Sequence, residues 1–184
     1  SSDLVVVSAM GKTTDYLVEM SKEIAINPNK REMDLILSTG EQVSIALLSM
    51  AFQEFGYDAI ALTGFQAGIK TYGPHTKNKI LDIDDEKIKN YLKEGKVVVV
   101  AGFQGVNENG DITTLGRGGS DTTAVAIAAK LGCPCHIYTD VDGIYSVDPR
   151  LYKEAKKLDV ISYEEMMEMA DRKSTRLNSS HCIV

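Results

Sequence analysis

Short apolar runs alternate with helix-like stretches along the chain, and this alternation limits the possible folds more than any other feature. The apolar runs, which have the length of buried strands, are residues 4–8, 59–63, 97–101 and 136–139. The helix-like stretches are residues 42–55, 86–94, 122–131 and 163–170. Glycine follows the first three of them, at the position where a left-handed residue ends a helix. This order predicts an α/β fold with a mostly parallel sheet that helices cover on both faces.

Three further segments are less regular. Residues 33–38 are apolar enough for a strand but run directly into a helical pattern, and periodicity leaves both interpretations open. Residues 79–83 and 111–115 are predicted to be small antiparallel additions, the second because it follows an Asn109-Gly110 turn. The sequence of residues 1–170 contains no internal repeat and no interdomain linker, so we predict one domain over this range.

Charge, hydropathy and cysteine content argue against several classes of protein. Twenty Lys and Arg residues against 26 Asp and Glu residues give a net charge of −6, which argues against a nucleic-acid-binding protein. The longest apolar runs are far shorter than the roughly 20 residues that span a bilayer, so we expect no membrane segment. The three cysteines have neither CxxC nor zinc-site spacing, which argues against disulfides and structural zinc. We expect a cytoplasmic protein.

Residues 171–184 differ in composition from the rest of the chain. They carry three basic residues and one acid, and they have no amphipathic period. Residues 171–181 also resemble the in-frame translation of a common sequencing adapter. We therefore expect residues 171–184 to be a non-native tail with no fixed place on the fold.

The densest glycine signal lies between a predicted strand and a predicted helix, in Thr114-Leu-Gly-Arg-Gly-Gly-Ser-Asp-Thr-Thr-Ala124. Such a turn directs backbone N–H groups and the positive end of a helix toward an anion. It matches neither a Walker A loop nor a dinucleotide fingerprint, and the chain has no protein-kinase HRD or DFG motif. The glycines could instead serve only a tight turn, with Ser120 or Asp121 as the helix cap. Arg117 favours the anion site, because a cation beside a helix N-terminus is unfavourable without an anionic ligand.

Two further segments carry polar side chains at candidate ligand sites. Ser38-Thr-Gly-Glu-Gln-Val-Ser44 is predicted to open a helix, with Glu41 near its positive end. Thr139-Asp-Val-Asp-Gly-Ile-Tyr-Ser-Val-Asp-Pro-Arg150 follows a predicted strand, where open α/β sheets bind ligands. In the second segment Tyr145 could cover a base and Arg150 could reach a phosphate, whereas the spacing of its acids does not match a calcium loop.

Seven motifs, taken in order, closely resemble the catalytic domain of the bacterial aspartokinases, which belong to the amino-acid kinase family. They are Ser8-Ala-Met-Gly-Lys-Thr-Thr-Asp15, Arg31-Glu-Met-Asp34, Ser38-Thr-Gly-Glu41, Thr63-Gly-Phe-Gln-Ala-Gly68, Val100-Ala-Gly-Phe-Gln-Gly-Val106, Leu115-Gly-Arg-Gly-Gly-Ser-Asp-Thr-Thr-Ala124 and the segment from Thr139 to Arg150. The resemblance covers residues 1–170. It implies a three-layer αβα sandwich of the carbamate-kinase-like type, with residues 33–38 helical. It also implies transfer of the ATP γ-phosphoryl group to the side-chain carboxylate of L-aspartate, the first step of lysine, threonine and methionine biosynthesis.

The same resemblance assigns roles to individual residues. Ser8 and Thr14 match positions at the aspartate pocket, and Glu41 matches the acid beside the substrate. The residues that match the loop holding aspartate are Arg117, Ser120 and Asp121; with Glu41, Arg117 and Asp121 form the implied catalytic set. The residues that match the nucleotide loop are Thr139, Asp140, Tyr145, Ser146, Val147, Asp148, Pro149 and Arg150. Mg²⁺ would be held mainly by the ATP phosphates, so no protein metal ligand is implied.

Parts of the family pattern have no counterpart in the chain. A first strand with a Lys-Phe/Tyr-Gly-Gly phosphate loop would precede Ser1, and a Lys-Val-Leu-His-Pro-like nucleotide segment and regulatory ACT domains would follow Ala170. We therefore expect the chain as given to be inactive, and its parent to be an oligomeric enzyme. Two alternatives stay open: a non-catalytic fragment, and a kinase of the same fold that acts on another amino acid such as glutamate or acetylglutamate.

Three other candidates are interpreted as structural residues. Cys133 and Cys135 are predicted to pack at a loop-to-strand junction, and His75 is predicted to be a solvated loop residue.

Overall fold

The central feature of the fold is a five-stranded sheet, sheet A. The computed structural model describes residues 3–138 and 181–183. Sheet A has the order β2 (Ala59–Leu62), β5 (Val97–Ala101), β1 (Leu4–Val7), β9 (His181–Ile183) and β8 (His136–Tyr138). β1, β2 and β5 are parallel to one another, whereas β9 is antiparallel to both β1 and β8. The predicted parallel core of the sheet is therefore confirmed.

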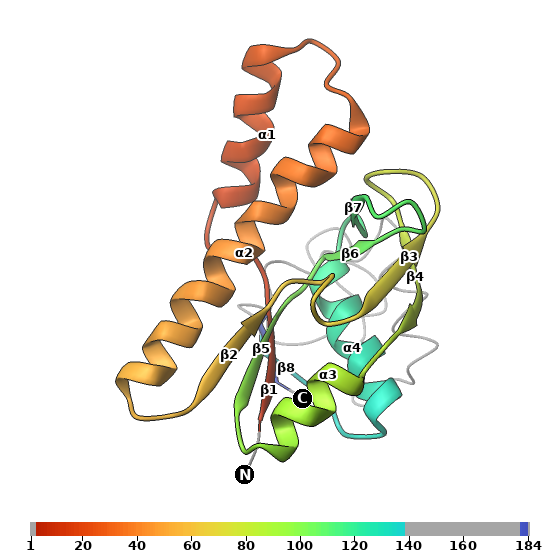
Figure 1. Cartoon of the computed structure of the whole chain (residues 1–184). Helices are drawn as coiled ribbons and strands as arrows, with labels where there is room; N and C mark the ends of the chain where they lie inside the picture. The colour runs from red at the N-terminus through yellow and green to blue at the C-terminus, as the bar shows by residue number, and fades with distance from the viewer. Residues whose placement is uncertain (1–2, 139–180, 184) are drawn as a thin grey trace, which may run out of the picture.

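Helices cover sheet A on both faces, as Figure 1 shows. Successive residues of β1 and β5 point to opposite sides because side chains alternate along a strand. Leu4, Val6, Val98 and Val100 face a core that includes residues of α3 (Glu86–Lys93) and α4 (Gly119–Leu131). Val5, Val7, Val97 and Val99 face the core formed with α2 (Lys30–Glu54). The two cores and their helices form the predicted three-layer αβα sandwich.

A second, smaller sheet follows the carboxyl ends of β2 and β5 along the chain. Sheet B has the order β4 (Lys79–Ile83), β3 (Ile69–Tyr72), β6 (Gln104–Val106) and β7 (Ile112–Thr114). β4 is antiparallel to β3 and β7 is antiparallel to β6, which confirms the two antiparallel additions predicted from the sequence. β7 leads into the glycine-rich segment, so sheet B carries that segment toward the end of sheet A.

The helix α2 begins earlier than its apolar pattern predicts. It runs without a break from Lys30 to Glu54 and includes residues 33–38, as the family resemblance implies. The prediction that residues 38–44 open a helix is wrong, because Glu41 lies in the middle of α2. Gly40 misled the prediction: an ideal Cβ there would lie 2.9 Å from the Ala9 Cβ, so glycine allows the helix to pass close to the end of β1.

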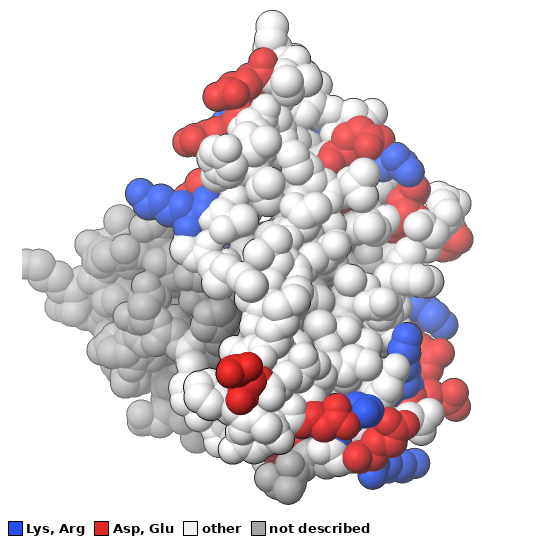
Figure 2. All heavy atoms as spheres, turned by 60° about the vertical axis from the view of Figure 1, so that its left-hand side comes forward, with Lys and Arg blue, Asp and Glu red and all other residues white. Residues whose placement is uncertain are grey.

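One side of α2 is apolar and exposed. Val43, Leu47 and Met50 are each about half exposed, and Figure 2 shows that the side of the molecule where α2 lies has few charged residues away from its margins. By length and composition alone α2 could cross a membrane. Its other side packs Ile45 against sheet A and buries Asp34 and Glu41, which is the arrangement of a core helix.

Four elements of the structure have no counterpart in the prediction. They are α1 (Thr13–Ile24), β3, β6 and β9. α1 packs along α2 and contains no fully buried residue. Figure 1 shows α1 and the first half of α2 as a helical hairpin that extends beyond sheet A, and the first half of α2 contacts β7 of sheet B.

The end of the chain contributes a strand to sheet A. Val5 pairs with Ile183 and Val6 with Cys182, and Cys182 also pairs with Ile137. Residues 181–183 therefore have a place on the fold, contrary to our expectation that residues 171–184 have none: they pair with edges of β1 and β8 that no other described strand occupies. That residues 171–184 are non-native stays a prediction. The predicted helix at residues 163–170 lies outside the described residues.

Candidate functional site

A pocket of about 330 Å³ lies where β1 and β5 end. It is lined by the residues that follow β1, the start of α1, the middle of α2 and Phe103 after β5. The glycine-rich loop and the first turn of α4 complete the lining. These residues are Ser8, Ala9, Gly11, Thr14, Asp15, Glu41, Phe103, Gly116, Arg117, Gly118, Gly119, Ser120 and Asp121. The carboxyl ends of parallel strands are where open α/β sheets bind ligands, so this pocket is the candidate site.

Glu41 forms the acidic wall of the pocket. The backbone N–H of Ala9 donates to its Oε1 over 3.1 Å, while its buried Oε2 has no hydrogen-bond partner in the described part of the chain. Burial raises the pKa of Glu41 to about 7, and hydrogen bonds from the backbone N–H groups of Glu41 and Ala9 oppose this only in part. A buried carboxylate with one unsatisfied oxygen favours a ligand that brings a positive charge or a donor.

The opposite wall is the glycine-rich loop and the N-terminus of α4. Gly116 and Gly118 have φ values of 83° and 74°, a backbone conformation that glycine adopts without strain. Gly118 is the N-cap of α4, so the alternative in which Ser120 or Asp121 caps the helix is wrong. Both side chains instead lie buried in its first turn. The loop thereby presents Arg117 and the positive end of α4 to the pocket.

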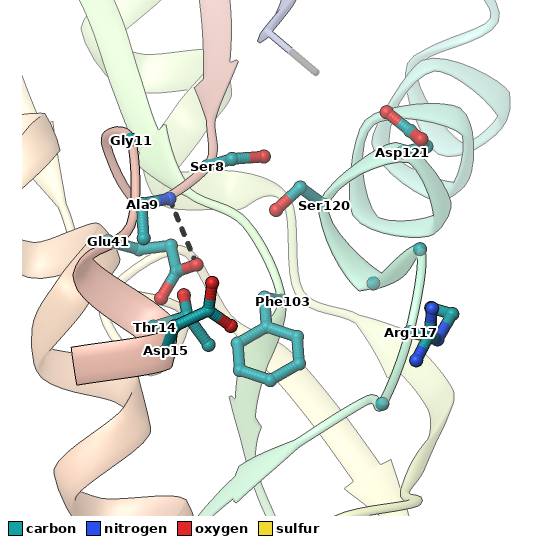
Figure 3. Close-up of a pocket in the computed structure, with 13 residues that line it drawn as sticks. Ser8, Ala9, Gly11, Thr14, Asp15, Glu41, Phe103, Arg117, Ser120 and Asp121 are labelled. Atoms are coloured by element: carbon teal, nitrogen blue, oxygen red, sulfur yellow. Dashed lines mark hydrogen bonds between the residues drawn. The ribbon is translucent and has the colours of Figure 1, made fainter. Parts of the chain in front are cut away.

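Gly102 allows α4 to start so close to the end of β5. An ideal Cβ at Gly102 would lie 2.8 Å from the Cα of Ser120, which is too short for any side chain. This contact fixes the first turn of α4 against sheet A and brings Ser120 to the pocket. In Figure 3 Ser8, directly after β1, and Ser120, in the first turn of α4, face each other.

Phe103 lies between the two walls, and sequence reasoning missed it. It has a φ of 69°, which is uncommon for a residue with a side chain. Two hydrogen bonds hold this conformation: its N–H donates to the Thr123 Oγ1 over 3.1 Å, and its carbonyl accepts from the Leu115 N–H over 2.9 Å. Figure 3 shows the ring between the group Glu41, Thr14 and Asp15 and the side chain of Arg117.

The structure brings together the residues predicted for the amino-acid site. Ser8, Thr14, Glu41, Arg117, Ser120 and Asp121 all line the pocket, although they come from four separate segments. Asp15 and Phe103 line it as well. Both residues stand in motifs that carry the family resemblance, but neither was given a role in the site. The residues predicted for the nucleotide loop, Thr139, Asp140 and Tyr145 to Arg150, lie outside the described residues.

One residue predicted to be solvated is anchored instead. The Nδ1 of His75 lies 2.6 Å from the Oδ2 of Asp34, a carboxylate that is completely buried. The prediction of a solvated loop histidine was wrong because the carboxylate that binds His75 lies about 40 residues earlier in the chain.

Comparisons with known proteins agree with this architecture. The profile described as the amino acid kinase family matches residues 1–180. The chain belongs to this family. It is 61% identical over 169 residues to an aspartokinase from Bacillus sp. (strain MGA3), which covers 91% of this chain and 41% of that protein. This chain thus spans about two fifths of the length of the relatives it matches.

Solved structures of aspartate kinases are also similar to the chain. The aspartate kinase from Synechocystis superposes with a TM-score of 0.68 at 55% identity, covering 91% of this chain and 28% of that one. Aspartokinase III from E. coli, crystallised with aspartate and ADP, superposes with a TM-score of 0.64 at 27% identity, covering 86% of this chain and 36% of that one. The family's αβα fold and the membership of this chain in it therefore rest on both sequence and structure.

Proposed function

We propose that the chain forms the amino-acid-binding part of an aspartate kinase, in which ATP phosphorylates the side-chain carboxylate of L-aspartate. The observation that carries the proposal is the polarity of the pocket. Glu41 supplies an unsatisfied buried carboxylate on one wall, and Arg117 with the N-terminus of α4 supplies positive charge on the other. An amino acid with an ammonium group and two carboxylates complements both walls.

Each wall has a role in holding the substrate. The planar guanidinium of Arg117 suits a two-pronged contact with the α-carboxylate. The Glu41 carboxylate forms an ion pair with the α-ammonium. This ion pair favours the charged form of Glu41 and so opposes the effect of burial on its pKa. Asp121, buried in the first turn of α4, lies on the wall opposite Glu41 and contributes a second acid. Ser8, Thr14 and Ser120 provide hydroxyl groups around the substrate.

The reaction requires little proton chemistry from the protein. A free aspartate side chain has a pKa near 3.9, so the nucleophile is already ionised at neutral pH and needs no general base. One of its oxygens attacks the γ-phosphorus, the bond from that phosphorus to the bridging oxygen breaks, and ADP leaves with the bonding electrons. The products are ADP and an acyl phosphate, 4-phospho-L-aspartate.

The main obstacle is the repulsion between the carboxylate and the triphosphate. The protein can reduce it with cations and with oriented N–H groups at the transferring phosphoryl group. Mg²⁺ bound to the ATP phosphates would neutralise part of the charge. Among the described residues no cluster of three or more His, Cys, Asp or Glu side chains could hold a metal ion.

A thermal-shift titration of the 184-residue chain tests the proposal. We expect L-aspartate to raise the melting temperature in a saturable manner, and L-glutamate and N-acetyl-L-glutamate to raise it less. The variant Glu41→Gln should abolish the effect, and Glu19→Gln on the exposed side of α1 should preserve it. A larger shift with L-glutamate than with L-aspartate would contradict the proposed substrate.

A further inference from the structure

Asp34 is a buried carboxylate that lies outside the pocket and that the proposed chemistry does not use. It is on α2, two helical turns before Glu41, and it is completely buried. Its Oδ1 accepts hydrogen bonds from the Thr114 Oγ1 over 2.5 Å and from the Thr76 N–H over 2.9 Å. Its Oδ2 lies 2.6 Å from the His75 Nδ1. A buried carboxylate with this many partners holds them in place strongly, because each unmade bond would leave a buried polar group unsatisfied.

The partners of Asp34 belong to two segments that touch the glycine-rich loop. Thr114 is the last residue of β7 and stands three residues before Arg117. His75 and Thr76 lie in the connection between β3 and β4, which contacts the loop directly. In that connection the Asn78 N–H donates to the Thr114 carbonyl over 3.0 Å, and the Thr76 carbonyl lies 3.3 Å from an ideal Cβ at Gly116.

The backbone of Thr76 shows that this contact is imposed from outside the turn. Thr76 has a φ of 69°, and a β-branched residue adopts this conformation only when its surroundings hold it there. The hydrogen bonds from the Thr76 N–H to both oxygens of Asp34 are what hold it. Asp34 thus fixes this turn, and the turn packs against Gly116 of the glycine-rich loop.

We propose that Asp34 is a positioning residue that fixes the Arg117 loop for its ligand, acting through Thr114 and through the turn at His75 and Thr76. The expected effect on L-aspartate binding rests on the proposed function, whereas the expected effect on the position of the Arg117 loop does not. Without the carboxylate, the start of the loop and the turn against it both lose their common anchor, and Arg117 spends less time in the orientation that binds a carboxylate.

Limited trypsin digestion tests the loop directly, because trypsin cleaves after Arg117 when the loop opens. We expect Asp34→Asn to speed cleavage between Arg117 and Gly118 about tenfold, and Thr114→Val to act in the same direction. Thr114→Ser, which keeps the hydroxyl group, should behave as the wild type. The matched control is Asp111→Asn, because Asp111 also joins α2 to the β6–β7 region, through Arg31 over 2.8 Å, and it is not among the hydrogen-bond partners of Asp34.

Two results would overturn the proposal. One is a folded Asp34→Asn or Thr114→Val protein in which cleavage after Arg117 is as slow as in the wild type. The other is equal acceleration at every exposed lysine and arginine, which would indicate general destabilisation. If Asp34→Asn does not fold, Thr114→Val decides alone.

Titration calorimetry with L-aspartate separates this inference from the proposed function. We expect Asp34→Asn to weaken L-aspartate binding about tenfold and Asp111→Asn to leave it unchanged. Faster cleavage after Arg117 in a protein whose wild type does not bind L-aspartate would support the positioning role and contradict the proposed function.

Discussion

Glu41 illustrates how one buried side chain couples stability to its ligand. Its raised pKa means that the folded chain retains a proton that the unfolded chain has lost between about pH 4.5 and 7. Stability therefore falls as the pH rises through this window, because the folded state binds more protons than the unfolded state there. The penalty at pH 8, in the absence of a ligand, is on the order of 3 kcal/mol.

The variant Glu41→Gln should remove this dependence. We compare the free energy of unfolding of the variant with that of the wild type. As the pH rises from 4 to 8, we expect this difference to shift in favour of the variant by up to about 3 kcal/mol. Urea unfolding at a series of pH values measures this difference. Glu19→Gln, at an exposed position on α1, is the control. Stability curves of Glu41→Gln and wild type that run parallel over this range would show that the buried carboxylate does not titrate as we describe.

Arg117 should depend on its geometry as well as its charge. Arg117→Lys keeps the positive charge but loses the planar fork. The loss of one charge-assisted hydrogen bond, roughly 1.5 to 3 kcal/mol, should weaken L-aspartate binding about 10- to 150-fold. Calorimetry measures the affinity, and Arg31→Lys is the control because Arg31 pairs with Glu32 and Asp111 at the surface. Equal affinities for wild type and Arg117→Lys would place the α-carboxylate elsewhere.

At the residue scale, the family resemblance located the pocket better than the local pattern did. Glu41, Arg117 and Ser120 were named from motifs, and each lines the pocket. Phe103 and Asp34 also stand in these motifs, but the motifs gave them no role, because their importance arises from contacts across the fold. Phe103 is held by Thr123 and Leu115, and Asp34 by residues about 40 and 80 positions away.

At the element scale, α2 shows what periodicity misses. The sequence Ser38-Thr-Gly-Glu41 has the composition of a helix start, yet it lies in the interior of a 25-residue helix. Glycine in a helix interior is unfavourable and persists here because the segment after β1 passes so close. The reason for Gly40 is therefore a tertiary contact that no local pattern contains. By contrast, α3, α4 and β5 were predicted within a few residues, since their apolar patterns and glycine caps agree with the packing.

The variant Gly40→Ala tests this explanation. Alanine normally stabilises a helix interior relative to glycine by roughly 0.5–1 kcal/mol. Here the new Cβ would lie 2.9 Å from the Ala9 Cβ, so we expect a net destabilisation of about 1–3 kcal/mol in urea unfolding. The double variant Ala9→Gly with Gly40→Ala should recover part of the loss, because it removes the opposing methyl group. A stabilised Gly40→Ala protein would show that the close approach is easily relieved.

At the scale of the whole molecule, the order of sheet A could be predicted only in part. The short apolar runs predict the parallel strands at the centre of sheet A. Because these runs alternate with helix-like stretches, they also predict helices on both faces of the sheet. The position of β9 could not be predicted, because residues 171–184 lack both an amphipathic period and a family match among the motifs. Its pairing with β1 and β8 depends on which strand edges the rest of the sheet leaves open.

The contribution of β9 can be measured at its central residue. Cys182→Pro removes a backbone N–H in the middle of the strand, and we expect the melting temperature to fall by several degrees. Cys182→Ser, which keeps the backbone donor, should have a much smaller effect. Differential scanning calorimetry of both variants provides the comparison. An unchanged melting temperature for Cys182→Pro would support the interpretation of residues 171–184 as a tail without a structural role.

The pairing of β1 with β9 also sets an order of events during synthesis. β1 lies near the beginning of the chain, and its partner β9 lies near the end. The ribosome adds roughly 5–20 residues per second, so β1 can pair with β5 seconds before residues 181–183 exist. The edge of β1 that pairs with β9 must wait until residues 181–183 have been added, and during that time it can pair with a strand of another molecule. A growing chain that already contains β1 and β5 is therefore most prone to aggregate before residues 181–183 emerge.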